Sequence, residues 1–248
     1  MFAPYRLICA AGLGAALFAV PAPSPLAAQA PTQTRLEVKY VRDADEYATL
    51  TRQVYREALA AVNGSNRARM SGPWSVVLDL DETVLDNSAY QLERAAYTLP
   101  FDDPSWNAWV ERGESGLVPG VVEFVSGVRR LGGHIAWISN RAESTRAATV
   151  ANLQRFNLWS DNDRLCLATD STYPKKVRRS EVTDGRGACS WTGAPAPVVV
   201  YVGDQMGDFP AAGESDPDAG KDDAFGRRFF ILPNPMYGAW TTRVTRQR

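Results

Sequence analysis

Four acidic side chains come directly after an apolar run in the segment VVLDLDETVLDN, residues 76–87. They are Asp79, Asp81, Glu82 and Asp86. The apolar run is typical of a buried strand. Side chains two residues apart on an extended segment point the same way, so Asp79 and Asp81 share one side. Two such carboxylates can supply a nucleophile and a general acid–base, whereas Glu82 and Asp86 are expected to orient the turn.

Polar residues also end two later apolar runs. The run HIAWI leads into Ser139, Asn140 and Arg141, and the run PVVVYVG leads into Asp204, with Asp208 about one helical turn later. Ligands of open α/β sheets bind beyond the carboxyl ends of the strands. We therefore expect acids from distant parts of the sequence to meet at one edge of a sheet.

Carboxylates that converge in this way repel one another, by about 4 kcal/mol for two unit charges roughly 4 Å apart at an effective dielectric constant of about 20. Oxygen ligands suit Mg²⁺, so the sequence predicts a divalent-cation site. The basic segment YPKKVRR offers cations for an anionic substrate, although such a run is usually a solvated helix face. Of Lys175, Lys176, Arg178 and Arg179, we expect at most one lysine to point inward.

The elements that must position these residues alternate along the chain. Five apolar runs lack a clear period of two, which favours a parallel sheet covered on both faces. These runs are PWSVVLDL, HIAWISN, RLCLATD, PVVVYVGD and RRFFILPN. Helices are expected from about 43 to 62, after Pro119, over ESTRAATVANLQRF and from KKVRRSEV onward. The predicted fold class is α/β, with a doubly wound parallel sheet.

The first thirty residues are typical of a removable export signal. Arg6 precedes the apolar run LICAAGLGAALFAV, which is short for a membrane span, and Ala28-Gln29-Ala30 resembles a cleavage site. An uncleaved anchor is the alternative. Cys9 lies near the start of the apolar run rather than after it, so it is not expected to carry a lipid. We expect a periplasmic or secreted protein without a stable membrane anchor.

Net charge and residue counts exclude several other classes of function. The 248 residues carry a net charge of −1, which fits one sizeable domain and gives no basic footprint for a nucleic-acid polymer. His134 is the only histidine, begins a strand and is expected to be structural, so chemistry that needs two histidines is excluded.

Beyond the signal, Cys166 and Cys189 are expected to form a disulfide in an oxidising compartment; two buried free thiols are the alternative.

The ordered motifs resemble those of a known family. DLDET, ISN, a downstream lysine and GDQMGD are similar to the haloacid dehalogenase (HAD) superfamily of aspartyl phosphotransferases. Longer stretches narrow the resemblance to the bacterial class C (subfamily IIIB) acid phosphatases, often secreted 5′-nucleotidases. These stretches are LDLDETVLDNSAYQ, SWNAWV, PGVVEF, GGHIAWISNR, VGDQMGDF and LPNPMYGAW. The resemblance implies one HAD-like phosphatase domain over 31–248, with a small cap from about 36–70, 87–118 and the C-terminal segment.

The resemblance also implies roles for the acids. Asp79 is expected to be the nucleophile that forms an aspartyl-phosphate. Asp81 is expected to be the general acid for the leaving alcohol, and then the base that activates water. The Mg²⁺ ligands implied are the Asp79 carboxylate, the Asp81 backbone carbonyl and Asp204, with Asp208 supporting the metal shell.

Phosphate-binding residues follow from the same resemblance. Ser139 and Lys175 are expected to bind the phosphoryl oxygens, with Lys176 left open as the alternative lysine. Thr83 and Asn140 are expected to shape the phosphate loop. The chemistry agrees, because a phosphate monoester dianion repels an attacking carboxylate until cations neutralise its charge.

Two aromatic residues match the family's clamp for the base of the leaving group. They are Trp106 in PSWNAWV and Tyr237 in NPMYGAW. Stacking on aromatic rings tolerates different bases, although Trp and Tyr also pack between a cap and a core. Trp109 and Trp240 are expected to pack structurally.

The function expected is that of a Mg²⁺-dependent acid phosphatase acting on small phosphomonoesters, nucleoside 5′-monophosphates first. One alternative is a phosphatase of broad scope for small esters. The other is a non-catalytic storage or binding protein on the same fold, which the intact Asp79 disfavours. A homodimer is compatible with the sequence.

Overall fold

Parallel strands form the central sheet, in the order β5-β4-β1-β6-β7. All four neighbouring pairs are parallel, and each of the five apolar runs in the sequence supplies one strand. The bounds are β1 (Ser75–Leu78), β4 (His134–Ala142), β5 (Arg164–Ala168), β6 (Val198–Gly203) and β7 (Phe229–Ile231).

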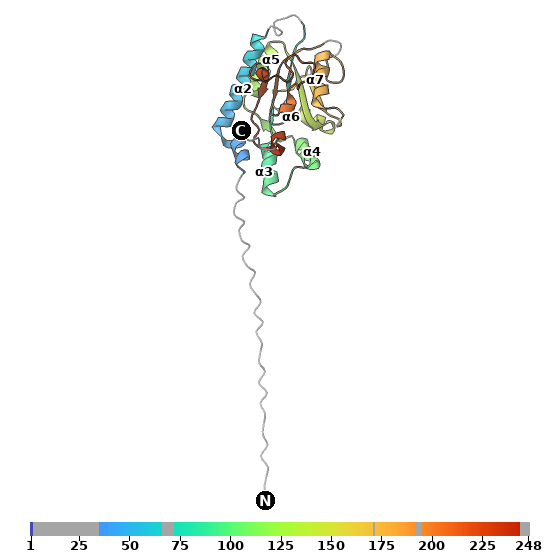
Figure 1. Cartoon of the computed structure of the whole chain (residues 1–248). Coiled ribbons are helices and arrows are strands. Elements are labelled where there is room, and N and C mark those ends of the chain that lie inside the picture. Colours follow the sequence, from blue (N-terminus) through green and yellow to red (C-terminus); the bar gives the residue numbers. More distant parts are fainter. Residues whose placement is uncertain (2–34, 66–71, 171, 192–194, 244–248) are drawn as a thin grey trace. The chain divides into compact units, whose positions relative to one another are not determined.

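This computed structural model describes residues 1, 35–65, 72–170, 172–191 and 195–243 (Figure 1). The expected export signal, with Arg6, Cys9 and the cleavage site, therefore lies outside the described residues. Among the residues that are described, no helix has both the length and the apolar character needed to cross a membrane.

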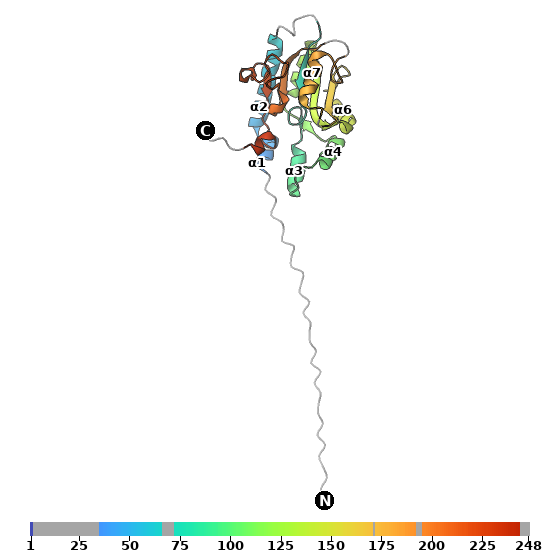
Figure 2. The same cartoon turned by 45° about the vertical axis from the view of Figure 1, so that its right-hand side comes forward.

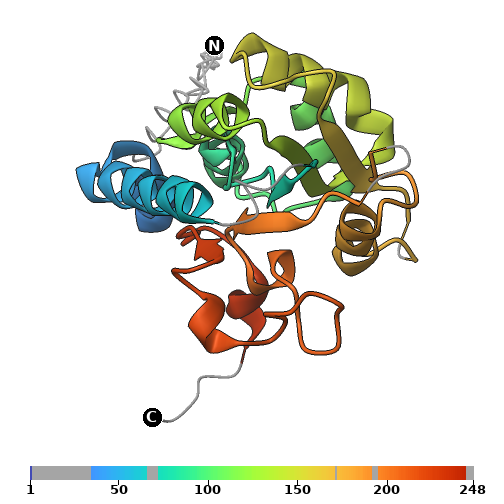
Figure 3. The same ribbon diagram turned by 90° about the horizontal axis from the view of Figure 1, so that it is seen from above.

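Helices cover both faces of the sheet (Figure 3). Val76 and Leu78 of β1 belong to the core under one set of helices, whereas Val77 belongs to the core on the other face. Because both faces are buried, the strands are apolar throughout, which explains why no period of two is visible in the sequence. The predicted doubly wound α/β fold is confirmed. One face carries α2 (Asp45–Gly64), α5 (Val121–Arg130) and α6 (Arg146–Arg155), and the other carries α7 (Lys175–Asp184).

The helix expected from about 43 to 62 is α2 (Asp45–Gly64), and a further helix that the sequence did not predict precedes it. α1 (Leu36–Asp43) ends at Ala44, whose extended backbone (φ −85°, ψ 125°) precedes α2. The sequence places 36–70 among the cap elements, but α2 packs on the sheet through residues such as Tyr55 and Val62. α1 lies beside the cap helix α3 (Ser88–Ala96).

Two short helices, α3 and α4 (Asp103–Arg112), lie together at the lower end of the views in Figures 1 and 2. The backbone N–H of Ser105 donates to Asp102 at 2.8 Å, which caps the start of α4. Gly113 ends α4 in the left-handed conformation, with φ of 63°. Both ends of α4 are therefore fixed, and Trp106 is presented from a defined helix. An antiparallel pair joins this region to the sheet, β2 (Leu85–Asp86) with β3 (Gly116–Leu117).

Short 3-10 turns complete the chain. Asp208 lies in such a turn rather than at the start of an α-helix, because the segment after β6 winds for only three residues before Phe209 becomes extended. The turns are η2 (Glu143–Thr145), η3 (Met206–Asp208), η4 (Asp222–Ala224) and η5 (Ala239–Thr242).

Candidate active site

A pocket of about 500 Å³ opens beyond the carboxyl ends of the strands, against α4. Asp81 follows β1, Asn140 lies near the end of β4, Lys175 begins α7 and Trp106 lies on α4. The fold therefore brings together side chains that are far apart in the sequence. The predicted site residues that line the pocket are Asp79, Asp81, Trp106, Asn140, Lys175 and Tyr237.

Three buried carboxylates meet at Asp79, which lines this pocket, and together they form the acidic floor of the site. Asp79, Asp204 and Asp208 each offer an oxygen atom, and these atoms lie within 4.8 Å of one another. The ammonium group of Lys175 contacts Asp79 and donates to Asp208 at 2.6 Å. Gly203 permits this approach, because a Cβ atom there would lie only 2.3 Å from the Cβ of Asp208.

The acids outnumber the cation, and the pKa values of Asp79 and Asp204 are raised. Burial raises the pKa of Asp79 well above its usual value; Lys175 opposes this shift, and the charges of Asp208 and Asp204 add to it. Burial, followed by the charge of Asp208, raises the pKa of Asp204 to about 6. Burial lowers the pKa of Lys175, but its two carboxylate partners outweigh burial and leave it raised. The floor is therefore short of positive charge.

The donor chemistry of the floor fits a hard divalent cation. All three ligands are oxygen atoms, which suit Mg²⁺. The Thr83 hydroxyl lies 3.3 Å from an oxygen of Asp79 and 3.3 Å from an oxygen of Asp204 and can donate its one proton to either, and Asn234 donates to Asp204 at 2.8 Å. These bonds orient the carboxylates without adding positive charge. Asp79, Asp204 and Asp208 are the residues that could hold such an ion.

The Asp81 side chain is separate from this cluster. Arg141 donates to its Oδ1 through Nη2 at 2.7 Å and through Nε at 2.9 Å. The Arg141 side chain is fully buried, and its guanidinium group lies 5.9 Å from the ring centroid of Trp106. A functional role for Arg141 was not predicted from the sequence. The sequence feature that could have indicated a role for Arg141 is its position directly after Ser139 and Asn140 at the end of β4.

The predicted phosphate-binding residues fall into two groups. Asn140 and Lys175 line the pocket, whereas Ser139 and Thr83 are fully buried. The Ser139 hydroxyl lies 3.2 Å from Oδ2 of Asp81. Lys176 is exposed, so the structure places Lys175 as the inward lysine.

The two arginines of YPKKVRR contradict the expectation of a solvated face. Arg178 and Arg179 are 1% and 4% exposed. Arg178 donates to the carbonyl oxygen of Ser139 and to Oδ1 of Asn140 at 2.8 Å, and Arg179 pairs with Glu214 at 2.7 Å. A guanidinium group carries five N–H donors, so carbonyl and amide oxygens can satisfy it inside the fold.

The predicted aromatic walls come from distant parts of the sequence. Trp106 packs against Tyr90, with ring centroids 5.1 Å apart, and the hydroxyl of Tyr237 contacts Glu82. Trp109 is buried, as expected. Trp240 is 51% exposed, contrary to the expected packing, because its role is local: its indole N–H donates to the carbonyl oxygens of Asn234 and Tyr237.

Glu82 and Asp86 shape the turn after β1. Glu82 is 1% exposed and has a φ of 60°, and burial raises its pKa well above the usual value. It accepts a hydrogen bond from the backbone N–H of Asn87 at 2.9 Å. Asp86 accepts one from the backbone N–H of Ser88 at 2.8 Å. Both interactions fit the expected role of orienting the turn.

The cysteines and the histidine lie outside this pocket. Cys166 and Cys189 are buried free thiols in one apolar cluster, so the structure has the alternative to the expected disulfide. Their side chains share a hydrogen bond, and burial raises the pKa of Cys166. His134 begins β4 and lies against Trp191, with ring centroids 5.1 Å apart. This position fits a structural role.

Several lining residues were missed by sequence reasoning. Phe101 and Asp103 fall in a segment without a motif, whereas Gln91 and Gln205 lie inside the quoted motifs LDLDETVLDNSAYQ and VGDQMGDF but were given no role. Phe101, 60% exposed, lies 6.2 Å from Trp106 between ring centroids and extends the aromatic wall. The others are Gln91, Asp103 and Gln205.

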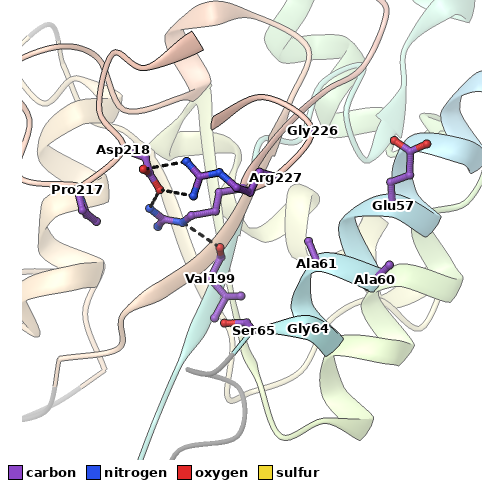
Figure 4. Close-up of a pocket in the computed structure, with 11 residues that line it drawn as sticks. Glu57, Ala60, Ala61, Gly64, Ser65, Val199, Pro217, Asp218, Gly226 and Arg227 are labelled. Carbon is purple, nitrogen blue, oxygen red and sulfur yellow. Dashed lines mark hydrogen bonds and ion pairs between the residues drawn. The ribbon is translucent and has the colours of Figure 1, made fainter. Parts of the chain in front are cut away.

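A second pocket, of about 710 Å³, lies between α2 and the segment around Asp218 and shares no lining residue with the first (Figure 4). Arg227 and Arg228 both donate to Asp218, at 3.1 and 2.7 Å. Arg228 also pairs with Asp216 at 2.9 Å. The charges in this pocket are matched by their own partners.

The fold and the acidic floor place the protein among HAD-type α/β proteins of the class C acid phosphatase kind. The class C acid phosphatase from Bacillus anthracis has 26% sequence identity and a TM-score of 0.70, over 85% of this chain and 87% of that one. The structure of the same enzyme with tungstate bound gives 28% identity and a TM-score of 0.68, with the same coverage.

The family itself is shown by a match over residues 21–240: the chain belongs to the HAD superfamily, subfamily IIIB (acid phosphatase). Curated relatives match a shorter part of the chain. Acid phosphatase 1 of Solanum lycopersicum is 28% identical over 168 residues, and the stem 31 kDa glycoprotein of Glycine max is 25% identical over 169. Each match covers 65% of this chain and spans 57% and 58%, respectively, of the relative's length.

Proposed function

We propose that this protein is a metal-dependent phosphomonoesterase that works through an aspartyl-phosphate intermediate. One observation carries the proposal: a carboxylate cluster paired with a single lysine lies at the floor of a pocket, and a second aspartate stands apart from it. Membership of the acid phosphatase family and the likeness to an enzyme solved with tungstate, a tetrahedral oxyanion, support it.

In the first half of the reaction, Asp79 attacks the phosphorus atom of the bound ester. Lys175 faces Asp79 and supplies positive charge to the phosphoryl oxygens, and the Asn140 amide lines the same pocket. Asp81 gives a proton to the departing alcohol oxygen. The products are the alcohol and a phosphate group on Asp79.

In the second half, Asp81 has lost its proton and takes one from the attacking water. Arg141 holds the Asp81 carboxylate in place during both halves. Asp79, Asp204 and Asp208 are the residues that would hold Mg²⁺, which neutralises charge on the transferring phosphoryl group when it is bound.

Nucleoside 5′-monophosphates are the substrates we propose first. Trp106 and Tyr237 line the pocket on the side of the leaving group, and Phe101 enlarges the aromatic wall. Trp106→Ala should lower turnover of a nucleotide about tenfold more than that of a sugar phosphate, because only the base can stack. An equal loss for both esters would favour the alternative of broad small-ester specificity.

The deciding experiment is phosphate release by the purified protein at mildly acidic pH. The panel contains 5′-mononucleotides, 3′-mononucleotides and sugar phosphates, each with Mg²⁺ and with EDTA. We expect metal-dependent release that favours 5′-nucleotides. Release from none of these esters would reject the enzyme and favour a storage or binding protein.

Export is the remaining part of the proposal. The apolar run and the Ala28-Gln29-Ala30 site support a removable signal and a periplasmic or secreted product. N-terminal sequencing of the protein recovered outside the cytoplasm should begin just after Ala30. A full-length, membrane-bound product would reject cleavage.

A further inference from the structure

Asn87 is a completely buried residue between the turn that carries Asp81 and the cap. It lies directly before α3 and does not line the pocket. Its side-chain oxygen accepts two hydrogen bonds, from the Trp109 indole at 2.9 Å and from the Ser115 hydroxyl at 2.6 Å. Buried polar groups are normally hydrogen-bonded, so what distinguishes Asn87 is which partners it has.

The partners fix which way round the amide lies. An indole N–H can only donate, so the atom of Asn87 that faces Trp109 must be the oxygen. The –NH₂ group therefore faces the catalytic turn, where it donates to Oδ1 of Asp81 at 3.0 Å and to the carbonyl oxygen of Leu85 at 3.2 Å. Trp109 of the cap therefore fixes the orientation of the Asn87 amide, and this orientation points the –NH₂ group at Asp81.

The two oxygens of Asp81 differ as a result. Oδ1 accepts from Asn87 and from both Nε and Nη2 of Arg141. Oδ2 has the Ser139 hydroxyl at 3.2 Å and a longer contact of 3.3 Å from the same Nε. A hydroxyl group can donate or accept, so it tolerates either protonation state of Oδ2. Oδ1, surrounded by three N–H donors, has no place for a proton.

We propose that Asn87 is a positioning residue for the reaction: by occupying Oδ1 of Asp81, it makes Oδ2 the oxygen that passes the proton to the leaving alcohol. This inference rests on the proposed function, in which Asp81 is the general acid. It also makes the cap part of the positioning, because the Trp109 indole on α4, which can only donate, sets which way round the Asn87 amide lies.

The test varies how much the leaving group needs a proton. p-Nitrophenolate leaves as a stabilised anion, whereas the alcohol of glycerol 2-phosphate needs protonation. kcat/KM is the right parameter, because hydrolysis of the aspartyl-phosphate is common to both esters and falls outside it. Asn87→Asp keeps the size and the acceptor facing Trp109 but replaces the donor to Asp81 with a carboxylate oxygen and so adds a negative charge beside Asp81, whereas Asn87→Ser removes the donor without adding a charge.

For Asn87→Asp we expect kcat/KM to fall about 30–100-fold for glycerol 2-phosphate and less than about fivefold for p-nitrophenyl phosphate. Competitive inhibition by inorganic phosphate should change less than about twofold. Asn87→Ser, which is too short to reach Asp81, should give the same pattern and replaces Asn87→Asp if that variant does not fold. Ser115→Ala is the matched control: it removes a bond on the far side of the amide and should leave the ratio of the two esters unchanged.

Equal losses for both esters, or the same change of ratio in Ser115→Ala, would overturn the inference. Asp81→Asn separates it from the function on which it rests. If Asp81→Asn shows the leaving-group pattern and the Asn87 variants do not, the inference alone fails. If Asp81→Asn shows no such pattern, the general-acid role and the inference fail together.

Discussion

The two pockets are both built around acidic side chains at least partly withdrawn from solvent, yet they are electrostatic opposites. In the catalytic pocket, Asp79, Asp204 and Asp208 share one lysine, and burial with mutual repulsion raises the pKa of Asp204 to about 6. In the second pocket, hydrogen bonds from Arg228 and then Arg227, set against a smaller opposing effect of burial, lower the pKa of Asp218 to about 2. Balance of charge, rather than the presence of acids, therefore distinguishes a functional cluster from a structural one.

The largest expected effect comes from Asp79→Asn. Removal of the nucleophile should lower kcat by more than about 10⁴-fold. The metal-free variant should melt no lower than the wild type in EDTA, because one of three crowded charges is gone. A large drop in melting temperature would place Asp79 with the structural acids of the second pocket.

The lysine that serves the catalytic cluster gives the next effect. Lys175→Met should lower kcat/KM for a phosphate ester about 10²- to 10³-fold, because the phosphoryl group loses its facing cation. Lys176→Met is the matched control, since Lys176 is exposed on the same helix. Steady-state assays of both variants test the assignment, and equal losses would refute it.

In the second pocket a substitution should act on stability alone. Arg228→Met leaves Asp216 and Asp218 without their shared partner, so the free energy of unfolding should fall by about 3–5 kcal/mol. Urea denaturation measures this change, and kcat/KM of the variant is the control. A loss of activity without a loss of stability would give this pocket a functional role.

The smallest effect is the pH dependence of the metal-free protein. The pKa of Asp204 is raised in the folded state, so its contribution to stability is present below about pH 4 and is lost as the pH rises through about 6. Relative to Asp204→Asn, the wild type should lose about 2–3 kcal/mol across that window. Thermal melts in EDTA from pH 4 to 8 measure the difference, and parallel curves would contradict the raised pKa.

The strands and the acids could be predicted because each is a local pattern. The apolar run and the acids Asp79 and Asp81 that follow it lie within twelve residues, so the pattern is visible in the sequence. Parallel strands bring their carboxyl ends to one edge of the sheet. Arg141 and Asn87 could not be assigned in this way, because their significance lies in which oxygen of Asp81 they occupy. The burial of Arg178 was mispredicted for the same reason: a basic helical run has the same composition whether its partners are water or carbonyl oxygens.

The C-terminal segment completes the catalytic turn, since Asn234 donates to Asp204 and the Tyr237 hydroxyl contacts Glu82. Synthesis proceeds from the N-terminus, so the sheet strands and Asp79 emerge well before these two contacts can form. Hydrolytic competence should therefore arrive late in the biogenesis of the chain. Under the export proposed above, this order has a benefit: a nascent chain still leaving the cytoplasm would not hydrolyse the phosphate esters of the cell that makes it.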